Sequence, residues 1–135
     1  MENYANTTFL GGTCNETTWR DELIAMLNKN VEVFNTVVDD WTPECQAREE
    51  EAKKHARFVL VVITSAMTGV FFIAEAVYCS NKRPERTLFY VIPDGFDKGQ
   101  MMSLRAVERM IKNNGGQIFE SLEGVASFLN SAYNN

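Results

Sequence analysis

The stretch that decides the fold is residues 58–76, FVLVVITSAMTGVFFIAEA. Its first six residues, Phe58 to Ile63, are all apolar and mostly β-branched. A run that is so short and so uniform is typical of a strand buried on both faces, in the middle of a parallel sheet. The Thr68-Gly69 turn follows too soon for the run to be a helix. We therefore predict a central strand, a turn and then a helix.

A single carboxylate, Glu75, stands in the apolar segment after this turn. At helical spacing its own face holds Phe71, Tyr78 and Cys79, so this face is not a polar one. An ionised carboxylate in such surroundings is costly unless it is paired or used chemically. Two interpretations follow: a structural ion pair with Arg83 or Arg86, or a functional carboxylate.

Strand and helix patterns alternate five times along the chain. Helix caps are expected at Thr18, at Thr42 before Pro43, and at Ser103. This alternation predicts a parallel sheet covered by helices on both sides, and right-handed crossovers give the strand order 2-1-3-4-5. With 135 residues, the chain is expected to form one α/β domain over residues 1–135. The expected strands are residues 7–10, 31–38, 58–63, 87–92 and 117–119.

In such a sheet, ligands bind beyond the carboxyl ends of the strands, near the point where the strand order switches. Two carboxyl groups that flank a bond suit glycosidic chemistry, and an indole can stack on a flat base. The competing interpretations are that Asp39 and Asp40 cap the next helix, that Gly11 and Gly12 form a tight turn and that Trp41 covers the core. The predicted catalytic residues are Glu75, Asp39 and Asp40, and the predicted substrate-binding residues are Gly11, Gly12, Thr13, Trp41, Thr68 and Gly69.

Three segments resemble one known family: residues 9–13 (FLGGT), 39–44 (DDWTPE) and 68–76 (TGVFFIAEA). They are similar to the nucleoside 2-deoxyribosyltransferase-like proteins, and the resemblance extends from about residue 7 to residue 129. It implies a flavodoxin-like three-layer fold and a glutamate nucleophile that forms a glycosyl-enzyme, which Glu75 matches. It also implies transfer of the deoxyribosyl group to another base or to water, and oligomers whose active sites borrow residues from a neighbouring subunit.

The chain also departs from this family. Arg57 and Ser65 stand near the places where well-characterised members carry aspartates. The family's subunit-donated residue near the C-terminus has only Asn130, Asn134 and Asn135 as candidates. Two alternatives to a transferase therefore stay open: a non-catalytic module that binds or senses a nucleotide, and a glycohydrolase of NAD type.

Composition limits the classes of partner. A net charge of −5 argues against non-specific nucleic-acid binding, which needs a basic surface. No apolar run is long enough for a membrane span, and no signal peptide is recognised. Cys14, Cys45 and Cys79 are odd in number and lack metal-like spacing, which indicates free thiols. We expect a cytoplasmic homo-oligomer that takes a small nucleoside or nucleotide and uses no cofactor or metal.

Overall fold

The computed structural model describes residues 4–14, 17–35 and 42–134. Within these residues, no helix is both long and apolar enough to cross a membrane. The strands are β1 (Thr7–Gly12), β2 (Glu32–Asn35), β3 (Phe58–Ile63), β4 (Thr87–Val91) and β5 (Gln117–Phe119). The helices are α1 (Trp19–Met26), α2 (Pro43–His55), α3 (Phe71–Lys82), the 3-10 helix η1 (Pro84–Arg86), α4 (Lys98–Asn113) and α5 (Leu122–Tyr133).

The five strands form one parallel sheet in the order β2-β1-β3-β4-β5, as predicted. β1 pairs with β3 from Thr8 opposite Phe58 to Gly12 opposite Val62. β2 lies on the other side of β1, so the chain reverses its direction across the sheet at the boundary between β1 and β3. The carboxyl ends of these two strands therefore form the switch point of a flavodoxin-like three-layer fold.

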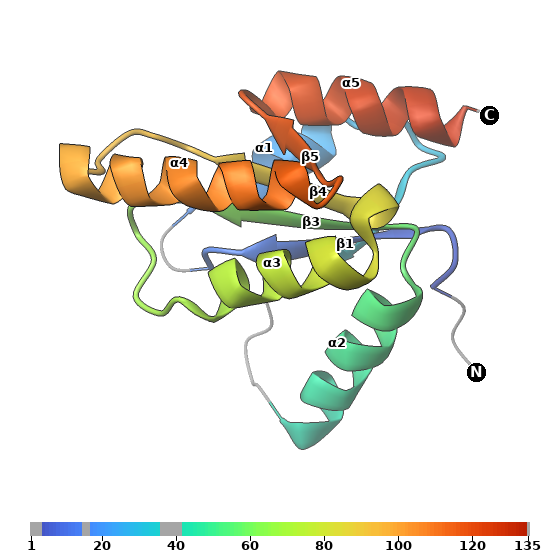
Figure 1. Cartoon of the computed structure of the whole chain (residues 1–135). Coiled ribbons are helices and arrows are strands. Elements are labelled where there is room, and N and C mark those ends of the chain that lie inside the picture. Colours follow the sequence, from blue (N-terminus) through green and yellow to red (C-terminus); the bar gives the residue numbers. More distant parts are fainter. Residues whose placement is uncertain (1–3, 15–16, 36–41, 135) are drawn as a thin grey trace.

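Helices cover both faces of the sheet (Figure 1). α1 and α5 pack on one face through a core that includes Trp19, Leu23, Val125 and Leu129. α2, α3 and α4 pack on the other face through a second core that includes Ala52, Ala76, Leu104 and Ile111. Each layer buries the apolar side of its helices against the sheet, which is the arrangement that alternating strands and helices favour.

β3 contributes to both cores, as its uniform apolar sequence predicts. Leu60 and Val62 point to the face that α1 and α5 cover, whereas Val59, Val61 and Ile63 point to the opposite face. Every residue of β3 is buried. Successive side chains of a strand point to opposite faces, so a strand that is covered twice needs apolar residues at every position.

Two of the three predicted helix caps lie at the right place. The backbone N–H of Cys45 donates to the Thr42 hydroxyl at 3.2 Å, and Pro43 opens α2. α1 follows Thr18, but the side chain of Thr18 makes no capping hydrogen bond. Its hydroxyl instead donates to the carboxylate of Glu22 at 3.2 Å.

The cap predicted at Ser103 is wrong, because α4 begins five residues earlier. Asp97 accepts the backbone N–H of Gln100 at 2.7 Å, and the Gln100 side chain accepts the backbone N–H of Asp97 at 2.9 Å. This reciprocal capping box stabilises the helix start ahead of Lys98, so Ser103 lies inside the helix. Leu104 and Ile111 are nevertheless buried, as the predicted apolar face requires.

α3 ends at Lys82, and η1 follows directly before β4. Ser80 is fully buried, its hydroxyl donates to the carbonyl of Val77 at 2.7 Å, and the Asn114 amide donates to that hydroxyl at 3.0 Å. These contacts with the end of α4 stabilise the last turn of α3. Residues 36–38 of the predicted second strand lie outside the described residues.

Candidate active site

A hollow of about 240 Å³ opens at the carboxyl ends of β1 and β3. Four of the predicted binding residues, Gly12, Thr13, Thr68 and Gly69, line it together. Its remaining lining residues are Cys14, Ile63, Met67, Phe71 and Phe72, so its wall is largely apolar. The switch point thus has a concave surface, as ligand sites of this sheet class do.

Thr13 is fixed in place by backbone contacts on three sides. Its N–H donates to the carbonyl of Val62 at 2.9 Å, and its hydroxyl accepts the N–H of Thr64 at 2.9 Å. Its carbonyl accepts the indole N–H of Trp19 at 3.0 Å. Trp19 is only 1% exposed, so it belongs to the core rather than to a stacking platform. These three hydrogen bonds therefore hold Thr13 at the edge of the hollow.

Arg20 is a buried cation beneath this loop, 5% exposed. Its guanidinium donates to the carbonyl of Thr13 at 2.8 Å and to that of Leu10 at 3.3 Å, and it lies 4.3 Å from the centre of the Trp19 ring. Burial lowers the pKa of Arg20, although an arginine keeps its proton at any ordinary pH. Arg20 thus binds the end of β1 to the start of α1.

The two glycines of β1 serve the packing of the sheet. Gly12 has a φ of +117°, and a Cβ at this position would overlap the backbone of Val62. A Cβ on Gly11 would come within 2.9 Å of the Phe72 ring. Gly12 also lines the hollow, whereas Gly11 is not among its lining residues. Gly69 has nothing within 4 Å of its would-be Cβ, so it borders open space.

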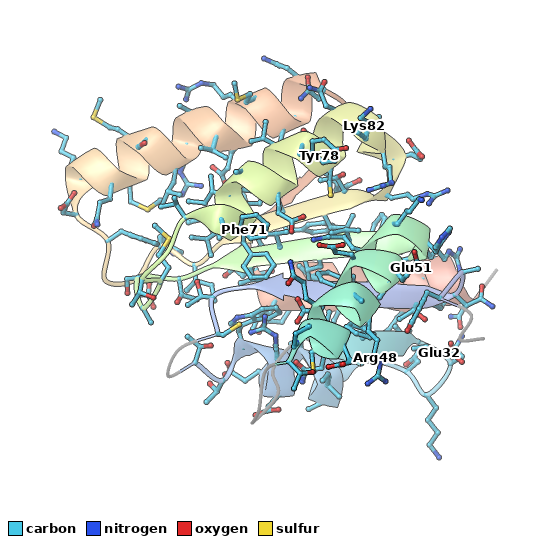
Figure 2. The ribbon with its side chains drawn as sticks, turned by 90° about the horizontal axis from the view of Figure 1, so that it is seen from below. Glu32, Arg48, Glu51, Phe71, Tyr78 and Lys82 are labelled. Carbon is cyan, nitrogen blue, oxygen red and sulfur yellow. The ribbon has the colours of Figure 1, made fainter. Side chains whose placement is uncertain are left out.

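Glu75 lines a second hollow, of about 580 Å³, between α2 and α3. Phe71 lines both hollows and is 67% exposed, so it stands between the two. Figure 2 looks onto the side of the sheet that carries α2 and α3, and it shows Phe71 at the start of α3. The other residues of the second hollow are Glu50, Lys53, Lys54, Ala74, Tyr78, Cys79 and Arg83. Phe71 is therefore shared by the hollow that Glu75 lines and the hollow at the switch point.

The partner of Glu75 is Lys53, which sequence analysis did not single out. The ammonium of Lys53 donates to Oε1 of Glu75, and the two side chains are 18% and 11% exposed. The partners expected for a structural ion pair of Glu75 were Arg83 and Arg86. Lys53 also stands four residues after Glu49, the spacing of an ion pair within one helix. The structure instead joins the two helices, because the sheet places α2 beside α3. No pattern within one helix could have indicated this pair.

A second carboxyl group, Glu49, lies one helical turn before Lys53 on α2. Burial raises the pKa of Glu49, the charge of Lys53 opposes this shift and the charge of Glu75 adds to it. Glu49, Lys53 and Glu75 thus form one electrostatic cluster. In the sequence, Glu49 stands four residues before Lys53, which is the spacing of a surface ion pair within one helix.

The remaining candidate residues fall into two groups. Asp39, Asp40, Trp41 and Asn135 lie outside the described residues. Asn130 accepts the backbone N–H of Asn28 at 2.8 Å and donates to the carbonyl of Met26 at 3.1 Å, so within this chain it joins α5 to the end of α1. The amide oxygen of Asn134 lies 3.4 Å from the side chain of Asn30, and Arg57 donates to the carbonyl of Ala132 at 2.7 Å.

The three cysteines are free thiols, as predicted. Cys79 is buried, and burial raises the pKa of its thiol, with the charge of Glu75 adding to the shift. A thiol that is held in its protonated form is a poor nucleophile. Within the described part of the chain, no group of three or more His, Cys, Asp and Glu side chains is placed to hold a metal ion.

Comparison with known proteins identifies the family of the chain. A family model described as "Nucleoside 2-deoxyribosyltransferase like" matches residues 6–95. This segment runs from just before β1 to the loop after β4, and it contains every lining residue of both hollows. No curated protein and no solved structure matches the chain.

Proposed function

Since the chain belongs to the nucleoside 2-deoxyribosyltransferase-like family, we propose that it cleaves or transfers the N-glycosidic bond of a (deoxy)nucleoside or nucleotide. The observation that carries the proposal is Glu75, a largely buried carboxylate in the hollow between α2 and α3. Phe71 lines this hollow and also the hollow at the switch point of the sheet. Functional carboxylates are found in such concave, partly apolar surroundings, where their reactivity can be controlled.

In the proposed reaction, a carboxylate oxygen of Glu75 attacks the anomeric carbon of the sugar. The bond between this carbon and the base nitrogen breaks, and its electron pair leaves with the base, which takes up a proton. Asp39 or Asp40 is the proposed proton donor, and both lie outside the described residues. The glycosyl ester on Glu75 is then attacked by a second base, which gives a new nucleoside, or by water, which gives the free sugar.

The substrate's parts divide between the two hollows. The base is assigned to the hollow at the ends of β1 and β3, where Phe71, Phe72 and Met67 offer apolar contact. The hydroxyls of Thr13 and Thr68 are assigned to polar atoms of the ligand. The sugar then lies at the boundary with the second hollow, within reach of Glu75.

A base-exchange assay tests this proposal. The protein is mixed with a deoxynucleoside and a different free base, and both are followed by chromatography. Glu75→Gln keeps the shape of the side chain and removes the nucleophile, so its rate should fall about a thousandfold or more. Glu85→Gln, the same change at an exposed glutamate after α3, is the control and should keep the native rate.

The reaction product distinguishes between the activities that the proposal allows. A new nucleoside indicates a transferase, whereas free base without a new nucleoside indicates a hydrolase, and NAD is tested beside the nucleosides. A binding module is the second candidate, because Arg57 and Ser65 stand where the family's acids are expected. Thermal stabilisation by a nucleotide that is recovered unchanged would support this module and would contradict the proposed enzyme.

A further inference from the structure

We propose that Lys53 is the positioning residue of the nucleophile Glu75, an inference that rests on the function proposed above. The ammonium of Lys53 contacts Oε1 of Glu75, which leaves Oε2 for attack on the sugar. A charged hydrogen bond of this kind fixes the orientation of a carboxylate. A nucleophile must be oriented toward the atom that it attacks.

The surroundings of Lys53 hold its ammonium over Glu75. The nitrogen lies 5.7 Å from the ring centre of Phe9 and 5.9 Å from that of Phe71, and the Phe9 ring is buried. Aromatic faces attract a cation at this range. Because both members of the pair are largely removed from water, their attraction is screened less than that of an exposed ion pair.

Direct contact with Glu75 makes Lys53 a positioning residue and not the proton donor. The nucleophile and the leaving base lie on opposite faces of the sugar, and the two carboxyl groups of retaining glycosidases are about 5–5.5 Å apart. An ammonium in contact with the attacking carboxylate is on the wrong side to reach the base. Lys53 therefore acts through Glu75, first by orienting it and then by stabilising it as the leaving carboxylate of the ester.

Other charged groups face this pair. α2 contributes Glu49, Glu50 and Lys54, and α3 contributes Arg83 and the thiol of Cys79. Glu49 is the competitor for the ammonium, since it is one helical turn from Lys53. Burial raises the pKa of Glu49, the charge of Lys53 opposes this shift and the charge of Glu75 adds to it. In the structure, the ammonium contacts Glu75.

The test compares Lys53→Met, which removes the charge, with Lys53→Arg, which keeps it. Lys29→Met is the matched control, because Lys29 is exposed in the turn after α1. Thermal unfolding first establishes that each variant is folded. The values of kcat and KM for deoxynucleoside cleavage are then measured separately for all four proteins.

For Lys53→Met, we expect kcat to fall about tenfold to a hundredfold while KM changes little, since a misplaced nucleophile loses transition-state stabilisation rather than substrate binding. Lys53→Arg should restore most of the native kcat, and Lys29→Met should match it. A folded Lys53→Met protein with the native kcat would overturn the inference while Glu75→Gln still upholds the proposed function. If the native protein cleaves no N-glycosidic bond, the proposed function itself fails.

Discussion

Replacing Gly12 should strongly lower the free energy of unfolding, although the change is only one methyl group. Gly12→Ala adds one methyl group that overlaps the Val62 backbone, at a φ of +117° that alanine rarely adopts. Strain and overpacking together should lower the free energy of unfolding by about 3 kcal/mol or more. Urea denaturation of the two proteins measures this difference.

Gly69→Ala is the control for that measurement. Its Cβ would meet nothing within 4 Å, so the free energy of unfolding should change by less than about 0.5 kcal/mol or rise slightly. Equal losses at the two glycines would contradict the close approach of Gly12 to β3. Two adjacent glycines such as Gly11 and Gly12 are common after strands. The sequence alone therefore did not reveal that Gly12 must be a glycine because it approaches the backbone of Val62.

The ion-pair partner of Lys53 could not be predicted from its position in the sequence. Its spacing from Glu49 is favourable for an ion pair within α2. The structure nevertheless pairs it with Glu75, because contacts between helices depend on how the sheet arranges them. The sequence does mark Glu75, since a lone carboxylate among apolar residues conflicts with its own surroundings, and its catalytic role stays a prediction.

At the scale of the element, the start of α4 gives a direct test of the corrected helix cap. Asp97→Ala removes the side chain that accepts the N–H of Gln100 and should lower the free energy of unfolding by about 1 kcal/mol. Ser103→Ala, inside the helix on an exposed position, should leave it unchanged or raise it by a few tenths of a kcal/mol. The midpoint of urea unfolding distinguishes the two.

A larger loss of stability in Ser103→Ala than in Asp97→Ala would indicate that the helix is capped by Ser103. Both residues are common caps, so the sequence offered two starts for one helix. The reciprocal bond between Asp97 and Gln100 decides between them. Thr42 had no such competitor, because Pro43 directly behind it marks the first helical position.

At the scale of the whole molecule, α5 closes one face of the sheet although it lies beyond the family match at residues 6–95. Leu129 is fully buried in the core that α1 and α5 share with the sheet. Leu129→Ala should therefore lower the free energy of unfolding by about 2–5 kcal/mol. Ser127→Ala, on the exposed side of the same helix, is the control and should have little effect.

Calorimetry measures both variants and also tests the prediction of a single domain over residues 1–135. One cooperative transition that shifts as a whole in Leu129→Ala would support it. A transition that splits, with the part from β1 to β4 unchanged, would show that α5 belongs to a separate unit. The hydroxyls of Tyr133 and Thr8, 2.8 Å apart, already join α5 to β1.

The sequence by itself determined the alternation of strands and helices, the central strand β3 and the strand order. It also predicted that Glu75, a lone carboxylate among apolar residues, is either paired or functional. These features follow from local patterns and from topological rules that hold for any chain of this class. Only the tertiary structure decided the partner of Glu75, the two hollows on either side of Phe71 and the helix start at Asp97. Each of these depends on distances between segments far apart in the chain, and residue spacing carries no information about such distances.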